Sequence, residues 1–198
     1  MRIAGLVLAA GRSSRMGPRN KLLEPVGGET IVRRVAATAI ASGAEPVIVV
    51  TGHEAASVAG ALRGLDVTIV ANPDYADGLS ASLRVGLRAL PADIDGALIL
   101  LGDMPEVEAP VLAALMAAFT GANAICVPVR HGRRGNPVLW GRSYFAEMMR
   151  LTGATGAKPL MARHKAQSIE VEVATDSIFE DVDAPEDLER LKRSGATS

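Results

Sequence analysis

Hydrophobic residues along the first two thirds of the chain form two alternating patterns. Short, almost continuous apolar runs occupy residues 3–9, 46–51, 67–71, 97–102 and 124–129. Such runs are typical of strands that are covered on both faces. Apolar positions at helical spacing lie between them, at residues 30–42, 53–63, 80–90 and 109–119. This alternation predicts a parallel sheet whose strands are connected by helices.

Residues that favour helix ends support these boundaries. Gly43 follows the first helical segment, where glycine is favoured as a C-terminal cap. Pro91 follows the third segment, and Pro110 lies in the first turn of the fourth, where proline is tolerated. The four segments are therefore predicted as separate helices.

The pattern changes after residue 130. Turn residues at 131–137 lead into a short strand, residues 143–151 have helical spacing, and residues 168–173 alternate like a half-buried strand. Residues 184–193 begin with proline and acids and end with cations, which suits the helix dipole. We predict one Rossmann-like α/β domain over residues 1–193, with a mostly parallel twisted sheet, helices on both faces and a small antiparallel C-terminal addition. Residues 194–198 are expected to form a disordered tail.

Composition and charge exclude several classes of function. The chain has a net charge of −1, so no global field attracts nucleic acid or an anionic membrane. No apolar run approaches the roughly 18 residues of a membrane span, and we read the apolar start of the chain as a strand rather than a signal peptide. One cysteine, Cys126, rules out an internal disulfide and favours the reducing cytoplasm.

The stretch "LAAGRSSRMGPRNK" (8–21) crowds cations into the turn after the first predicted strand. Ligands of open α/β sheets bind beyond the carboxyl ends of strands. Small residues there let backbone N–H groups approach an anion, and serines and cations add side-chain donors. The spacing of the glycines in residues 8–21 matches neither the P-loop motif nor the dinucleotide-binding motif. The alternatives are a solvated turn or a polyphosphate site formed by Ala10, Gly11, Arg12, Ser13, Ser14, Arg15 and Lys21.

Asp103 follows the apolar run 97–102 directly, so its carboxylate is expected at the same edge of the sheet. Magnesium is usually held by one or two carboxylates together with substrate phosphates. The alternative role for Asp103 is to cap the turn before Pro105. Next to a polyphosphate loop, the metal role is favoured.

Several segments together resemble the MobA-like nucleotidyltransferases, and most closely their molybdenum cofactor cytidylyltransferases. The first stretch carries the fixed elements of L-A-A-G-x-S-x-R-M-G-x-x-K, with one additional residue before Lys21. Four later segments follow the family pattern in order: "NPDYADGLSASLRVGL" (72–87), "LLGDMP" (100–105), "RGNPVLW" (134–140) and "DVDAPEDL" (181–188). The resemblance therefore covers nearly the whole chain.

The resemblance implies transfer of a nucleoside monophosphate to the phosphate of molybdopterin, with release of pyrophosphate. It implies Mg²⁺ as cofactor and two metal ligands, Asp103 and Asp183. Asp181 is the neighbouring possibility, and Asp183 has helix capping as its alternative role. Arg15, Lys21 and Asp103 are the predicted catalytic residues. The predicted nucleotide-binding residues are Leu8, Ala9, Ala10, Gly11, Ser13, Arg15, Lys21, Gly78 and Ser80.

In the family that this chain resembles, enzymes that use CTP have alanine at the position of Ala10, whereas enzymes that use GTP have glycine there. Ala10 therefore favours CTP over GTP. Arg134, Asn136 and Lys158 are expected on the acceptor side, although arginines 130, 133 and 134 also suit an ordinary exposed hairpin. A molybdoenzyme or its chaperone is the partner that this function implies.

One segment departs from the family pattern. Residues 153–158 read "GATGAK" where the family commonly has G-D-x-G-A-R, so Ala154 replaces an acid and Lys158 an arginine. Lysine keeps the charge but loses the two-pronged fit of arginine to phosphate. Two other functions therefore stay open: transfer to another phosphorylated acceptor, such as a sugar or alcohol phosphate, and a non-catalytic carrier of nucleotide or cofactor.

The remaining marked residues favour structural roles. His53 is expected at a helix start, and His131 and His164 at the surface without an acidic partner. Cys126 is expected in the core. Ser80 is a plausible N-cap of the helix that follows Gly78.

Overall fold

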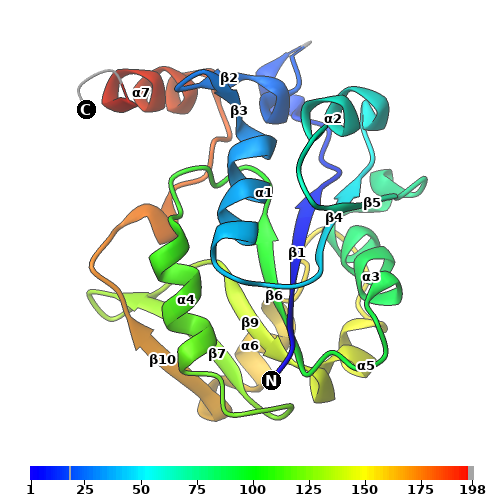
Figure 1. Ribbon diagram of the computed structural model, residues 1–198, viewed down its shortest axis with the longest axis vertical. Helices are drawn as coiled ribbons and strands as arrows, with labels where there is room; N and C mark the ends of the chain where they lie inside the picture. The colour runs from blue at the N-terminus through cyan, green and yellow to red at the C-terminus, as the bar shows by residue number, and fades with distance from the viewer. Residues whose placement is uncertain (18, 196–198) are drawn as a thin grey trace.

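The computed structural model describes residues 1–17 and 19–195. Within them, eight strands form one sheet in the order β10-β7-β9-β6-β1-β4-β5, with β8 paired to β7 (Figure 1). The central strand β1 (Ile3–Ala9) is buried along its whole length. It runs parallel to β4 (Val47–Thr51) and β6 (Gly96–Leu101), and β5 (Thr68–Ala71) forms one edge beyond β4. The runs at 3–9, 46–51 and 97–102 thus form buried strands, as predicted. The run at 67–71 differs, because β5 is an edge strand and most of its residues are exposed.

The second half of the chain adds the antiparallel part of the sheet. Strand β9 (Val138–Gly141) runs antiparallel to both β6 and β7 (Ile125–Arg130), and the short β8 (Arg133–Arg134) is antiparallel to β7. The edge strand β10 (Ser168–Glu172) is parallel to β7. The mostly parallel sheet with an antiparallel addition is confirmed, but the antiparallel strand β9 lies inside the sheet rather than at its end.

Helices cover both faces of this sheet (Figure 1). One core contains apolar side chains of α1 (Ile31–Ala41), α4 (Ala109–Ala117) and α7 (Pro185–Gly195). The other core contains those of α3 (Leu79–Ala89), α5 (Phe145–Met148) and α6 (Lys158–Arg163). Helix α2 (Ala55–Ala61) adds Val58 to the first core. The cores are almost entirely aliphatic, as the low aromatic content requires.

Shorter elements complete the fold. A small hairpin consists of β2 (Pro25–Val26) and β3 (Glu29–Thr30), and it lies near α7 (Figure 1). Single 3₁₀ turns are η1 (Ser14–Met16), η2 (Lys21–Leu23), η3 (Tyr75–Asp77), η4 (Arg142–Tyr144), η5 (Lys165–Gln167) and η6 (Ser177–Phe179). The helix predicted over residues 143–151 is therefore shorter than expected, because η4 and the single turn α5 share this segment.

Three structural predictions have mixed outcomes. Cys126 is buried in the core as expected, and burial raises the pKa of its thiol to about 11. The prediction that His164 has no acidic partner is wrong, because its Nε2 lies 3.2 Å from the Glu147 carboxylate. The contact joins residues 17 positions apart, so spacing along the chain does not reveal it. His53 precedes α2, which begins at Ala55.

The remaining structural predictions concern the end of the chain and membrane-spanning helices. Helix α7 extends to Gly195, so residues 194 and 195 of the expected tail continue a helix, and 196–198 lie outside the described residues. No helix in the described part of the chain has the length and apolar character needed to cross a membrane.

Candidate active site

Three segments meet at one edge of the sheet. Strands β1 and β6 are parallel neighbours, so the loop after β1 and Asp103 after β6 emerge at the same edge. The third segment, residues 181–183, comes from the end of the chain. The Val182 backbone N–H donates to the Asp103 carbonyl oxygen over 2.9 Å and holds this segment beside the other two.

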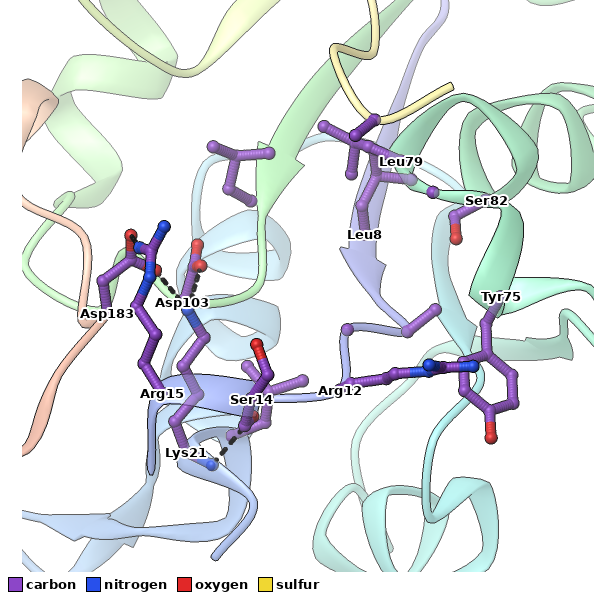
Figure 2. Close-up of a pocket in the computed structure, with 17 residues that line it drawn as sticks. Leu8, Arg12, Ser14, Arg15, Lys21, Tyr75, Leu79, Ser82, Asp103 and Asp183 are labelled. Atoms are coloured by element: carbon purple, nitrogen blue, oxygen red, sulfur yellow. Dashed lines mark hydrogen bonds and ion pairs between the residues drawn. The ribbon is translucent and has the colours of Figure 1, made fainter. Parts of the chain in front are cut away.

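The three segments surround a cavity of about 580 Å³ (Figure 2). Its lining comes from the loop after β1, the start of α3, the end of β6 and two more distant loops. The lining residues are Leu8, Ala10, Gly11, Arg12, Ser13, Ser14, Arg15, Lys21, Leu22, Tyr75, Gly78, Leu79, Ser82, Leu101, Asp103, Ala154 and Asp183. The cavity has the size and the mixed polar and apolar lining expected for a small-molecule site.

Side-chain hydrogen bonds fix the loop around Lys21. The Ser13 hydroxyl accepts the Lys21 backbone N–H over 3.1 Å and donates to the Asn20 side-chain oxygen over 3.3 Å. That oxygen also accepts the Leu22 backbone N–H over 3.1 Å. Ser13 adopts a left-handed conformation with φ of 53°, which turns the chain sharply. Ser13 therefore positions Lys21, a role that was not foreseen for it.

Lys21 forms the centre of a cation–carboxylate cluster (Figure 2). Its Nζ donates to Asp103 Oδ2 over 2.7 Å and to Asp183 Oδ1 over 2.8 Å. Arg15 Nη1 donates to the other oxygen, Asp183 Oδ2, over 2.6 Å. The Lys21 side chain is only 11% exposed, whereas that of Arg15 is 71% exposed. The two predicted catalytic cations and both predicted metal ligands are thus in direct contact.

The charges in this cluster shift the pKa values of its members. Burial alone would lower the pKa of Lys21, but Asp103 and Asp183 outweigh burial and raise it. The hydrogen bond from Lys21 lowers the pKa of Asp183. The pKa of Asp181 is raised by partial desolvation and by the like charges of Asp183 and Asp103, although the residue itself is exposed. Lys21 therefore remains a cation at neutral pH.

Three carboxylates of the cluster fit a divalent ion. Asp103, Asp181 and Asp183 each offer an oxygen, and these atoms lie within 4.8 Å of one another among the described residues. Oxygen donors of this kind suit Mg²⁺ and other hard divalent cations. Helix capping does not explain Asp183, because the backbone N–H groups of Asp183 and Ala184 donate to Asp187 Oδ2, over 3.1 and 3.0 Å. Asp187 provides that cap.

The other end of the cavity has an aromatic wall. The Arg12 guanidinium lies 5.6 Å from the centre of the Tyr75 ring (Figure 2). Outside the cavity lining, the centre of the His53 ring lies 6.1 Å from the centre of the Tyr75 ring. Tyr75 packs tightly against Gly52, where an added Cβ would come within 2.5 Å of the Tyr75 Cβ. An added Cβ at Gly52 would also lie 2.8 Å from that of Ala10. Tyr75 therefore lies beside Ala10, the residue that is predicted to favour a cytosine base.

The divergent 153–156 segment packs against the start of α3. Gly78 has φ of +99°, and a Cβ there would lie 2.8 Å from the backbone of Gly153. The Ser80 backbone N–H donates to the Gly153 carbonyl oxygen over 3.1 Å. Ala154 reaches the first cavity, whereas residues 155–158 line a second one. This segment therefore separates two neighbouring cavities.

The second cavity has a volume of about 220 Å³ and a more apolar wall. The two cavities share Leu8, Leu79 and Leu101. All three predicted acceptor residues, Arg134, Asn136 and Lys158, line the second cavity. The other residues along it are Leu83, Ile99, Val127, Gly135, Val138, Trp140, Thr155, Gly156, Ala157 and Met161.

The arginine-rich hairpin is held by contacts with other segments. Arg134 Nη2 lies 2.7 Å from Glu170 Oε1, and the Arg133 guanidinium lies 4.4 Å from the centre of the Phe179 ring. Arg130 Nε lies 3.8 Å from the Asp176 carboxylate. Among these three arginines, Arg134 is the one that reaches a cavity.

Most of the predicted nucleotide-binding residues line the first cavity, but two do not. Ala9 and Ser80 are buried away from it, and Ser82 lies there instead. The prediction that Ser80 caps α3 is wrong, because the cap position is Gly78 and Ser80 Oγ is buried without a hydrogen-bond partner. One helical turn separates Gly78 from Ser82, so the helix rotation turns Ser82 toward the cavity. Sequence reasoning also missed Tyr75, whose only signal was its place in the 72–87 segment.

Comparison with known proteins agrees with this geometry. The chain is 31% identical to the purine catabolism protein PucB of Bacillus subtilis (strain 168), over 97% of each chain. It is 34% identical over 133 residues to the bifunctional protein GlmU of Micrococcus luteus, but this match spans only 27% of GlmU.

Solved structures share the whole fold. A nucleotidyl transferase from Methanothermobacter thermautotroptrophicus is 28% identical, with a TM-score of 0.87 over 99% of this chain and 98% of its own. Rv0371c from Mycobacterium tuberculosis H37Rv, in complex with manganese, is 30% identical, with a TM-score of 0.82 over 98% of this chain and 100% of its own. The MobA-like NTP transferase domain matches residues 5–168. This chain therefore belongs to the family of MobA-like NTP transferase domains.

Proposed function

We propose that the protein transfers a nucleoside monophosphate from a triphosphate to a phosphorylated acceptor and releases pyrophosphate. One observation carries this proposal: the Lys21 ammonium, on the small-residue loop, contacts Asp103 and Asp183 at the edge of one cavity. Cations for phosphates and carboxylates for a divalent ion are thus combined in one site. Nucleotidyl transfer needs both.

The proposed reaction needs no general base. A phosphate oxygen of the acceptor is already anionic at neutral pH and attacks the α-phosphorus, and the bond from that phosphorus to the bridging oxygen of pyrophosphate breaks. Residues 10–15 would hold the triphosphate through backbone N–H groups. Arg15 and Lys21 would stabilise the charge that builds up on the leaving pyrophosphate. Catalysis then depends on positioning and electrostatics.

The carboxylates of Asp103 and Asp183, with Asp181 beside them, would hold the divalent ion, for which we propose Mg²⁺. When bound, such an ion neutralises phosphate charge and orients the phosphates. The manganese complex of Rv0371c supports a divalent ion in this fold.

The second cavity is the proposed place of the acceptor. Its apolar wall includes Trp140 and Val138, and Lys158 and Arg134 supply positive charge. This combination suits a phosphorylated molecule whose ring system packs against apolar side chains, and molybdopterin in its molybdenum-bound form is the acceptor we propose. The shared wall at Leu8 and Leu101 would bring the acceptor phosphate next to the triphosphate.

We propose CTP as the preferred triphosphate, because Ala10 lines the cavity and packs close to Gly52 and Tyr75. One methyl group at this position narrows the space for a base. A molybdoenzyme or its chaperone would then receive the product. The cytoplasmic location stays a prediction from the single cysteine.

The test measures pyrophosphate release from each of ATP, CTP, GTP and UTP, with and without molybdopterin and with Mg²⁺ present or chelated. We expect release that depends on both molybdopterin and Mg²⁺ and is fastest with CTP. Release that is equally fast without molybdopterin would contradict the proposed acceptor. A preference for GTP would contradict the role given to Ala10.

Two other functions have an observation in their favour. The similarity to GlmU supports a different phosphorylated acceptor, such as a sugar or alcohol phosphate. Ala154 and Lys158 in the 153–158 segment support a non-catalytic carrier of nucleotide or cofactor. Calorimetric titration beside the pyrophosphate assay separates them: tight binding of molybdopterin without turnover indicates a carrier, and turnover only with another phosphate ester indicates a different acceptor.

A further inference from the structure

We propose that Lys21 competes with the divalent ion for Asp103 and Asp183, so that the triphosphate must draw Lys21 away before the ion binds tightly. This inference rests on the proposed function, because it takes the carboxylates of the cluster as the metal ligands. It assigns to Lys21 a second role, which is to set the order in which nucleotide and metal are bound.

The hydrogen bonds of the cluster show the conflict. Lys21 engages Asp183 Oδ1, and Arg15 engages Asp183 Oδ2, so both oxygens of this carboxylate are already bound to cations. Lys21 also engages Asp103 Oδ2. A Mg²⁺ ion sits about 2.0–2.1 Å from its oxygen ligands, closer than the ammonium does. The ion and the Lys21 ammonium would share the same oxygens and repel each other.

Lys21 is the stronger of the two competing cations. Its side chain is 11% exposed and contacts two carboxylates, whereas that of Arg15 is 71% exposed and contacts one. The backbone of Lys21 is held by the Ser13 hydroxyl. Contacts between solvent-exposed charges are weak, whereas removing one partner of a buried pair is costly. Displacement of Lys21 is therefore the larger obstacle to metal binding.

A triphosphate in the first cavity would remove this obstacle. Lys21 lines that cavity together with Gly11 and Ser14, so its flexible side chain can reach phosphate oxygens in the same space. Once Lys21 has moved, the cluster of three carboxylates retains only Arg15 as an ion-pair partner among the described contacts. The excess negative charge then favours a divalent cation. Phosphate binding and metal binding are thus expected to reinforce each other.

The experiment measures Mn²⁺ affinity by electron paramagnetic resonance without any nucleotide. It compares the wild type with Lys21→Met, which removes the charge but keeps a long side chain. We expect Lys21→Met to bind Mn²⁺ at least about tenfold more tightly, because one competing charge a few ångströms away is gone. Mn²⁺ should also raise the melting temperature of Lys21→Met more than that of the wild type.

Arg19→Ala is the matched control, since Arg19 is a cation of the same loop that pairs with Glu24 at 3.7 Å rather than with the cluster. Its Mn²⁺ affinity should equal that of the wild type. An equal gain in Arg19→Ala would overturn the proposal, because the effect would then reflect overall charge. Unchanged or weaker Mn²⁺ binding by folded Lys21→Met would also overturn it.

Two further measurements keep the outcomes distinct. If Lys21→Met fails to fold by circular dichroism, Lys21→Gln takes its place with the same expectation. A parallel titration adds α,β-methylene-CTP, which cannot release pyrophosphate. If neither the wild type nor any variant binds Mn²⁺ even in the presence of this analogue, the metal site of the proposed function is itself wrong. If the wild type binds Mn²⁺ with the analogue and Lys21→Met shows no gain without it, only the competition is wrong.

Discussion

The chemistry of the site depends on a few side chains of opposite charge that contact one another. Lys21 is almost buried, yet it remains a cation because Asp103 and Asp183 lie within hydrogen-bonding distance. An ammonium buried without such partners would lose its proton at a much lower pH. The same contacts keep Asp183 ionised. Lys21 and Asp183 thus each maintain the charge that the proposed reaction needs.

We expect Lys21→Ala and Asp103→Ala each to lower kcat/KM by roughly 10²–10³-fold, because each removes one preorganised charge from the phosphates or the metal. Initial rates of pyrophosphate release at CTP concentrations below KM, with Mg²⁺ present, measure this loss. Glu189→Ala is a suitable control, because this side chain pairs with Lys192 outside the cavity. Near-normal rates in either cluster variant would remove that residue from the catalytic assignment.

The first turns of two helices, α7 and α3, fix the segments that carry the side chains of the site. Helix α7 begins at Pro185, two residues after Asp183, and Asp187 in its first turn accepts the backbone N–H groups of Asp183 and Ala184. Helix α3 is preceded by its cap residue Gly78, whose lack of a side chain lets the 153–156 segment approach the first turn. The N-terminal ends of α7 and α3 therefore define opposite sides of the site.

Asp187→Ala should lower the free energy of unfolding by about 1 kcal/mol at pH 7, because two backbone donors lose their acceptor. The hydrogen bond from Ala184 lowers the pKa of Asp187 below its unfolded value. This contribution is therefore present above about pH 4 and is lost as the pH falls through the folded-state pKa. Urea unfolding at pH 7 and at pH 3 tests it: the difference between wild type and variant should shrink at pH 3. A difference that is the same at both values would contradict the ionised cap.

Gly78→Ala should destabilise the protein by about 1–3 kcal/mol, because an L residue is strained at φ of +99° and its Cβ would collide with Gly153. We also expect weaker nucleotide binding, since the 153–156 segment must move. Gly60→Ala in α2 is the matched control: its added Cβ meets nothing within 4 Å, and it should be neutral or slightly stabilising. Equal stability of the two variants in thermal unfolding would show that the close packing at Gly78 is unimportant.

The molecule as a whole places two cavities side by side at one edge of the sheet. Strands β1 and β6 carry Leu8 and Leu101, which belong to both cavities. Strand β9 lies beside β6 and brings Val138 and Trp140 to the second cavity. Insertion of this antiparallel strand next to the parallel ones therefore creates the proposed acceptor site.

Arg134→Ala should raise the KM for molybdopterin about tenfold and leave the Kd for CTP unchanged, because Arg134 lines the second cavity but not the first. Steady-state kinetics and calorimetric titration measure the two constants. Arg88→Ala, an exposed arginine at the end of α3 outside both cavities, should change neither. A loss of CTP affinity equal to the loss of acceptor affinity would contradict the assignment of separate ligands.

Local patterns were sufficient for the strands and helices of the large sheet in the first two thirds of the chain and for the position of the charged loop, but not for the hairpin of β2 and β3 or for helix α6. Continuous apolar runs make buried strands because both faces are covered, and small residues followed by cations after β1 indicate an anion site wherever the chain goes next. The position of Asp103 follows as well, since parallel neighbours end at the same edge. These inferences need only the order of residues along the chain.

Contacts between distant segments required the tertiary structure. The placement of β9 between β6 and β7, the approach of residues 181–183 to Asp103 and the packing of Tyr75 against Gly52 join residues that no local spacing relates. The hydrogen bond from Val182 to Asp103 joins residues that are 79 positions apart along the chain. Short-range preferences leave such contacts undetermined because many chain paths satisfy them equally, and only the packing of the complete core selects one. The direct pairing of Lys21 with two aspartates, on which the competition with metal depends, arises from that selection.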